Sequence, residues 1–208
     1  MDKLSNVRLQ PLQKSMYIKP LSLTYDQNGK PHKWDFLTVH DSVAIILYNT
    51  TRNKLLMVKQ FRPPVYIGSI PEKDRTEIID TEKYPASLGV TIECCAGIVD
   101  KNLSLAEIAS EEILEECGYK VDANKLEKVA AYKSGVGTSG SMQTLFYCEV
   151  TDDMKVAGGG GVDDELIDVI EMSIPEVQAY MKQEMVVSPP SFMFAMQWFL
   201  AKMKVPAV

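Results

Sequence analysis

The segment from Ser104 to Cys117 is the feature that most restricts how this chain can fold. Ser104 followed three residues later by Glu107 is typical of a capping box, and Gly118 stands where a left-handed C-terminal cap is expected. The spacing therefore predicts a helix over residues 104–117. Its apolar side chains recur at helical spacing and form a stripe that must face a core, made of Leu105, Ile108, Ala109 and Ile113.

Two glutamates, Glu112 and Glu116, fall inside that apolar stripe, and Glu115 lies at its edge. Glu107 and Glu111 lie further round, toward solvent. Carboxylates directed at a core carry a desolvation cost of several kcal/mol each. No Lys or Arg occurs between residues 101 and 120 to offset it. A hard divalent cation, Mg²⁺ or Mn²⁺, is the natural counter-ion, and the alternative is a solvated acidic helix face.

The strand expected over residues 90–95 ends at Ala96 and Gly97, just before the acidic helix. A glycine at this point allows close approach of the backbone. We therefore expect the carbonyl of Ala96 to contribute to the same metal site.

The remaining pattern predicts an α+β fold, a mixed sheet flanked by helices, in one domain with extensions. Further strands are expected over residues 21–25, 34–39, 43–48, 54–61, 129–133, 143–150 and 166–171, and further helices over 175–183 and 192–204. The run Gly158–Gly161 predicts a mobile loop, for which a surface loop with chance acids is the alternative.

Composition excludes several classes of function. The net charge is -6 and the chain has only four arginines, so we expect no nucleic-acid partner. The longest apolar run, residues 43–48, is far short of the roughly 20 residues that span a bilayer. The start of the chain lacks an apolar signal region. The four cysteines form no metal-binding or disulfide pattern, so we expect buried thiols in a cytoplasmic protein with no membrane contact.

Several other residues are candidates for substrate contacts. Arg62 follows an apolar strand and precedes two prolines, which would present its guanidinium to phosphate oxygens, unless it is an ordinary strand-end charge. Trp34 and Phe36 alternate along one strand, so both rings share a face and either stack on a nucleobase or belong to the core. The glycine-rich turn that contains Gly137 would let the backbone approach a sugar or phosphate, or is only a loop.

Residues 97–119 resemble the Nudix box, GX5EX7REUXEEXGU, at seven of its nine specified positions. Leu103 replaces the first glutamate and Glu111 replaces the arginine, two residues that usually form an internal ion pair. The resemblance to this family is close and extends over nearly the whole chain, through residues 33–36, 40–43, 58–63, 93–100, 115–119, 134–137 and 143–144. From these stretches we also place Glu93 among the substrate-binding residues.

The resemblance implies a Nudix fold with an α/β/α arrangement. Residues 1–40 would form a β extension for dimerisation and substrate binding, and residues 41–208 the hydrolase domain of a homodimer. The implied reaction is Mg²⁺-dependent hydrolysis of a nucleoside diphosphate sugar, UDP-glucose and water giving UMP and glucose 1-phosphate. The alternatives are cleavage of ADP-ribose to AMP and ribose 5-phosphate, and a non-catalytic nucleotide-sugar-binding protein.

The family's catalytic glutamates map onto residues that the helical pattern had already singled out. Glu112 and Glu116, with Glu115 and the Ala96 carbonyl, would hold the metal ions. Glu115 also counts as catalytic. The resemblance points to Glu165 as a further metal ligand or as the general base, with Asp163 as a competing candidate.

Overall fold

The computed structural model describes residues 3–162 and 165–205. Its strands are β1 (Lys19–Gln27), β2 (Lys30–Thr38), β3 (Ser42–Asn49), β4 (Lys54–Phe61), β5 (Val90–Glu93), β6 (Cys95–Ile98), β7 (Glu127–Lys133), β8 (Met142–Val150) and β9 (Ile167–Ser173). Its α-helices are α1 (Pro63–Gly68), α2 (Leu105–Glu112), α3 (Ile174–Met181) and α4 (Pro190–Lys202).

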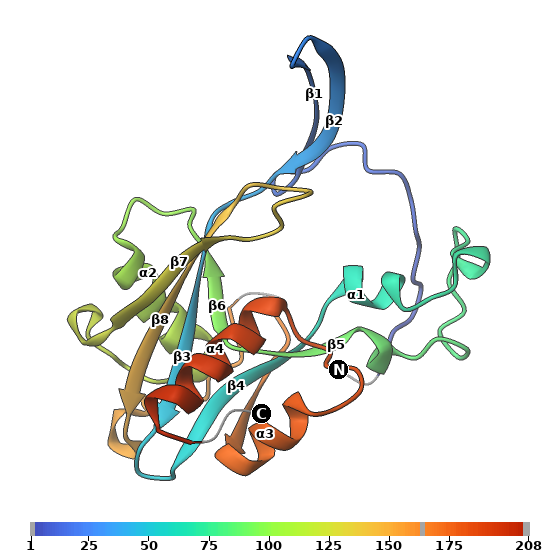
Figure 1. Ribbon diagram of the computed structural model, residues 1–208. Coiled ribbons are helices and arrows are strands. Elements are labelled where there is room, and N and C mark those ends of the chain that lie inside the picture. The colour runs from blue at the N-terminus through green and yellow to red at the C-terminus, as the bar shows by residue number, and fades with distance from the viewer. Residues whose placement is uncertain (1–2, 163–164, 206–208) are drawn as a thin grey trace.

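The described strands form one mixed seven-stranded sheet and a separate hairpin (Figure 1). The central path of the sheet is β5-β4-β3-β8-β7, with β6 paired to β3 and β9 paired to β4. β3 and β8 run parallel, whereas the other neighbours are antiparallel. The predicted α+β fold with a mixed sheet is therefore confirmed.

The segment expected as one strand over residues 90–95 is two short strands that meet at Cys94. β5 pairs with the end of β4, and β6 pairs with the start of β3. β3 and β4 pair with each other only near the turn that connects them, from the Leu47–Leu56 pair to the Asn49–Lys54 pair. A single straight strand cannot pair with both diverging neighbours, so the chain crosses from one to the other at Cys94. This divergence opens the sheet where the site described below lies.

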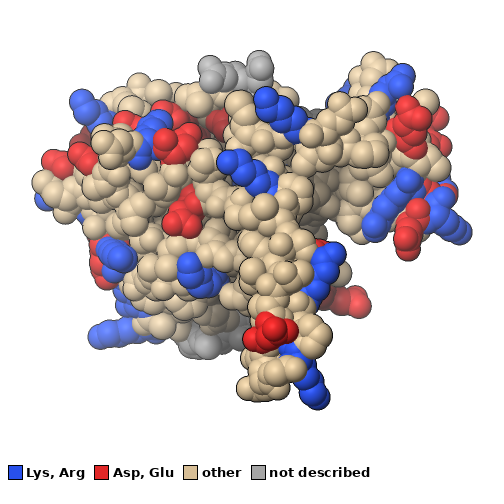
Figure 2. Space-filling view, turned by 90° about the horizontal axis from the view of Figure 1, so that it is seen from above, with Lys and Arg blue, Asp and Glu red and all other residues tan. Residues whose placement is uncertain are grey.

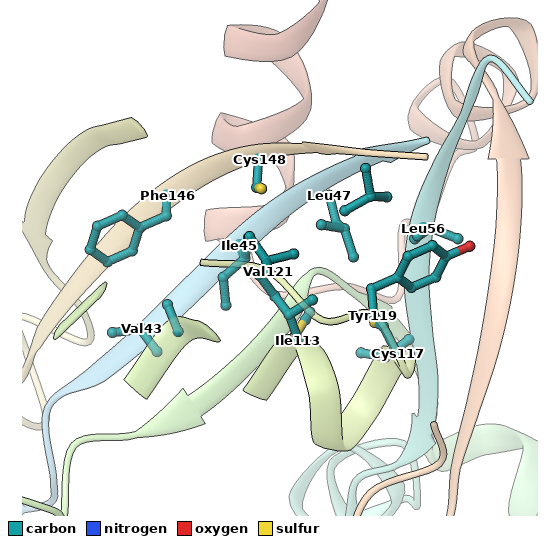
Figure 3. Packing of buried hydrophobic residues seen from close by; sticks show 14 of the residues in the cluster. Val43, Ile45, Leu47, Leu56, Ile113, Cys117, Tyr119, Val121, Phe146 and Cys148 are labelled. Carbon is teal, nitrogen blue, oxygen red and sulfur yellow. The ribbon is translucent and has the colours of Figure 1, made fainter. Parts of the chain in front are cut away.

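The sheet has a hydrophobic core on each face because the side chains of β3 alternate. Val43, Ile45 and Leu47 pack toward α2 and the segment that follows it, as Figure 3 shows. Ala44, Ile46 and Tyr48 belong to the second core, with α3 and α4. The sheet is thus covered by helices on both faces, and the predicted α/β/α layering is confirmed.

The acidic helix begins as predicted and ends differently. Ser104 and Glu107 form a capping box, with the Glu107 N–H donating to Ser104 Oγ at 3.2 Å and the Ser104 N–H donating to Glu107 Oε2 at 2.8 Å. Gly118 closes the helix with a φ of 79°. The last turn, Ile113–Cys117, is a π-helix rather than an α-helix. Such wider turns occur frequently at functional sites.

The hairpin of β1 and β2 projects from the body of the molecule (Figure 1). Its register places Leu21 opposite Phe36, Leu23 opposite Trp34 and Tyr25 opposite His32. Because side chains alternate along a strand, these six residues share one face of the hairpin. Leu21, Leu23, Tyr25 and Trp34 are exposed there.

Three expectations from composition can be compared with the structure. All four cysteines are free and buried, as predicted. No helix within the described ranges is long and apolar enough to cross a lipid bilayer. On the face seen in Figure 2, the basic and acidic side chains are interspersed, and no broad basic patch is visible there.

Candidate active site

Glu116 is the most deeply buried acidic residue of the helix, with 4% of its surface exposed. Its Oε2 accepts a hydrogen bond from the backbone N–H of Ala96 at 3.0 Å. Burial raises the pKa of Glu116 to about 7, although the Ala96 N–H and the Cys95 thiol oppose this by hydrogen bonding to the carboxylate. The inward orientation predicted from the helical stripe is confirmed.

Glu112 lies against Gly97 of β6. A Cβ atom added to Gly97 would overlap the Glu112 carboxyl group, so only glycine leaves room for this carboxylate. Burial, followed by the negative charges of Glu116 and Glu115, raises the pKa of Glu112 to about 8. Two carboxylates are therefore held close together at a real electrostatic cost.

The glycine tract forms a loop without helix or strand that packs onto the C-terminal end of the acidic helix, and its predicted mobility stays a prediction. The N–H of Gly160 donates to the Glu116 carbonyl at 2.8 Å, and the N–H of Gly161 donates to the Glu115 carbonyl at 3.0 Å. These bonds satisfy carbonyls that a helix end otherwise leaves without partners. Gly159 has a φ of 74°, and a side chain there would collide with the Glu116 backbone.

This packing brings Glu165 to the acidic helix. Glu165 Oε2 accepts a hydrogen bond from the Val162 N–H at 3.0 Å, and Glu165 lines the same cleft as Glu112, Glu115 and Glu116. Asp163, the competing candidate, lies outside the described residues.

Arg62 enters the cleft at the end of β4, held by a bidentate ion pair. Its Nε and Nη2 donate to the two carboxylate oxygens of Glu93, at 2.8 and 2.9 Å. Thr91 also donates to Glu93 Oε1 at 2.6 Å. Burial tends to raise the pKa of Glu93, but Arg62 outweighs it and the pKa lies below its ordinary value. Glu93 thus fixes the guanidinium, and direct contact between Glu93 and substrate stays a prediction.

These residues line a single cleft of about 1250 Å³, large enough for a nucleotide sugar. It contains Arg62, Glu93, Ala96, Gly97, Glu112, Glu115, Glu116 and Glu165.

The other predicted substrate contacts lie elsewhere. Trp34 is exposed on the hairpin and donates to the Gly137 carbonyl at 3.1 Å, while Phe36 lines a small separate hollow. The structure does not bring these three residues into the cleft of their own chain.

The donor chemistry of the cleft fits a divalent cation. It gathers carboxylate oxygens, whose raised pKa values in Glu112 and Glu116 show that their charge is poorly compensated. The Ala96 carbonyl leaves β6 on the same side as its N–H, toward Glu116, because both groups of a strand residue point to one edge. Within residues 3–162 and 165–205 no three such side chains already converge as a metal centre. A bound ion would therefore have to draw the carboxylates together.

Sequence reasoning missed several residues of the cleft. Lys101 lies beside the acidic helix, and the aromatic rings of Tyr132 and Phe194 meet edge to face at 5.4 Å on another part of the wall. They belong to separate elements, so no spacing along the chain indicates that they share a cleft.

Comparison with known proteins agrees with this geometry. No protein-family model matches the chain. The chain is 39% identical to uridine diphosphate glucose pyrophosphatase NUDT14 of Bos taurus, over 97% of this chain and 96% of that protein. The Mus musculus protein of the same name is 38% identical over the same shares. A GDP-mannose pyrophosphatase of Cronobacter sakazakii is 30% identical over 78% of each chain. The chain belongs to the Nudix hydrolase family.

Proposed function

We propose that this protein is a Mg²⁺-dependent pyrophosphatase of nucleoside diphosphate sugars, and that it converts UDP-glucose and water to UMP and glucose 1-phosphate. The observation that carries the proposal is a pair of carboxylates that face one cleft with Arg62: Glu116, which is buried, and Glu112, which is half-buried. The names of the relatives supply the substrate class, since they include pyrophosphatases of uridine diphosphate glucose and of GDP-mannose.

In this proposal Glu112, Glu116, Glu115 and the Ala96 carbonyl hold the metal ions. When bound, Mg²⁺ neutralises the charge of the diphosphate and acidifies the attacking water. Mn²⁺, which also favours oxygen ligands, is expected to substitute for it. Arg62, oriented by Glu93, binds phosphate oxygens through Nη1, which has no hydrogen-bond partner among the described residues.

Glu165 is our candidate for the general base, with Glu115 as the second candidate. The base takes a proton from water as the water oxygen bonds to one phosphorus of the diphosphate. The bond from that phosphorus to the bridging oxygen breaks, and the bridging oxygen leaves with the other phosphate. One water is consumed, and UMP and glucose 1-phosphate are formed.

A substrate panel tests the proposal. Purified protein with Mg²⁺ should release UMP and glucose 1-phosphate from UDP-glucose, and chelation of the metal should reduce the rate at least about a hundredfold. GDP-mannose and ADP-ribose belong in the same panel, because faster cleavage of ADP-ribose to AMP and ribose 5-phosphate would favour that alternative. If all three substrates bind but remain intact over hours, the protein is a non-catalytic binding protein.

We also propose that the chain forms a homodimer through the apolar face of its hairpin. A two-stranded hairpin is marginally stable alone, and exposed large apolar side chains on one face mark an interaction site. Leu23 and Trp34 face each other across the strands and are 53% and 56% exposed. A second copy covering this face would bury them, and would carry Trp34 and Phe36 toward the substrate bound by the partner.

Leu23→Asp tests the dimer. Placing a charge at the centre of this face should shift the sedimentation coefficient from that of a dimer to that of a monomer at micromolar concentration. Ser22→Asp is a matched control, because Ser22 lies on the opposite, polar face of the same strand. If both variants sediment like the parent protein, the hairpin does not form the interface.

The location proposed for the protein is the cytoplasm. Its four free, buried cysteines suit a reducing compartment. The nucleotide sugar, rather than a nucleic acid or a membrane, is the proposed partner besides the second copy.

A further inference from the structure

Lys101 lies in the short connection between β6 and α2, beside the acidic helix. Its Nζ forms an ion pair with Glu111 Oε2 at 2.6 Å, and the same Nζ is 3.9 Å from Glu115 Oε1. Its positive charge also acts on Glu112, where it opposes the rise in pKa caused by burial and by the neighbouring carboxylates. One ammonium group therefore faces three acidic residues of this helix.

The Lys101–Glu111 pair links the β6–α2 connection to the helix. The ion pair between glutamate and arginine that is usual in the Nudix box is missing here. Leu103, at the position of the first box glutamate, is 42% exposed and cannot pair with Glu111. The charges are reversed here, with the cation on the connection and the anion on the helix. With glutamate rather than arginine at position 111, the net charge of the helix is more negative by two units.

The other basic residues of the cleft form their hydrogen bonds with groups outside the helix. Among the described residues that line the cleft, the basic ones are Arg62, Lys101 and Lys133. Arg62 is held by Glu93, and Lys133 Nζ donates to the Gly140 carbonyl at 2.7 Å. Arg62 also lowers the pKa of Glu116, so among these three residues Lys101 is the cation placed to offset Glu112 and Glu115.

We infer that Lys101 is a built-in counter-ion of the metal-binding carboxylates, and that Glu111 limits its competition with the metal by holding the ammonium closer to itself than to Glu115. The inference rests on the proposed function. In the metal-free protein, Lys101 reduces the repulsion among Glu111, Glu112 and Glu115. When a divalent cation binds, the ion pair with Glu111 keeps the lysine charge at the rim of the site. Both side chains are positioning residues, because they act through Glu112 and Glu115.

The two halves of this ion pair should shift metal affinity in opposite directions. Lys101→Ala removes a competing positive charge, so the half-saturating Mg²⁺ concentration should fall about three- to tenfold. Glu111→Ala removes a negative charge and allows Lys101 to move closer to Glu115, so the half-saturating Mg²⁺ concentration should rise by a similar factor. Without metal, Lys101→Ala should lower the melting temperature, whereas Glu111→Ala should lower it less or raise it.

Binding of Mg²⁺ alone is measured in two ways, by calorimetry and by the Mg²⁺-dependent rise in melting temperature. Lys83→Ala is the control, since the Lys83–Asp74 pair is similarly exposed but lies outside the cleft, and Mg²⁺ affinity should not change. If Lys101→Ala and Glu111→Ala shift Mg²⁺ affinity in the same direction, the ion pair only stabilises the local structure. That result would overturn the inference but not the proposed metal site. No Mg²⁺ binding by the parent protein would overturn the proposed metal dependence together with this inference.

Discussion

Glu116→Gln should lower Mg²⁺-dependent turnover of UDP-glucose by about a thousandfold or more while the protein stays folded. The substitution removes one negative charge from the proposed metal site, where such charges contribute several kcal/mol to transition-state stabilisation. The amide oxygen of glutamine can still accept the Ala96 N–H, so the contact between β6 and the helix survives. The metal-free variant should melt at a higher temperature than the parent protein, because a buried charge has been removed.

The control for this prediction is Glu107→Gln on the same helix. Glu107 is exposed and serves in the capping box, a role that glutamine also fills. The turnover of Glu107→Gln should stay within about twofold of the parent rate, because Glu107 lies on the surface outside the cleft. Steady-state rates at saturating Mg²⁺ and thermal melts of both variants provide the comparison. Equal losses at the two positions would show that inward placement of Glu116 is not what matters for activity.

Gly97→Ala should reduce turnover at least about a hundredfold, because the added methyl group occupies the space of the Glu112 carboxylate. Glu112 is a flexible side chain that can swing aside, so the fold should persist with a small change in melting temperature. The displaced carboxylate can no longer join Glu116 in the proposed metal site. Mg²⁺ should therefore stabilise the variant against heat much less than it stabilises the parent protein.

Gly68→Ala is the matched substitution for Gly97→Ala. A Cβ atom at Gly68 meets no atom within 4 Å, and this residue ends α1 outside the cleft. The rate and the Mg²⁺ response of Gly68→Ala should equal those of the parent protein. Retention of full activity by Gly97→Ala would mean that Glu112 does not act from the position seen here.

Local signals predicted most of the secondary structure well. β4 has the bounds expected from its apolar pattern, and the capping box of Ser104 and Glu107 lies where the spacing placed it. These features depend on neighbours within a few residues, which the sequence displays directly. The π-helical turn of Ile113–Cys117 escaped prediction, because its apolar spacing differs too little from that of an α-helix over one turn.

The helical repeat predicted the placement of the acidic residues better than strand alternation predicted the placement of the aromatic residues. Glu112 and Glu116 lie on one helix, so the helical repeat alone brings them to one face. Trp34 and Phe36 share a face of the hairpin as expected from strand alternation, yet neither residue lines the cleft of the same chain. Alternation along a strand specifies which side chains lie together but not which surface they meet.

The sequence by itself determined the acidic helix and its inward glutamates, because both follow from a repeat of 3.6 residues. The cost of burying their charge is the reason for the proposed cation. Only the tertiary structure decided which distant groups meet these glutamates. The divergence of β3 and β4 places Arg62 and Ala96 in the cleft, the glycine tract brings Glu165 to the helix end, and Lys101 pairs with Glu111. Such contacts join separate elements of the chain, and their distances are fixed by packing rather than by spacing in the sequence.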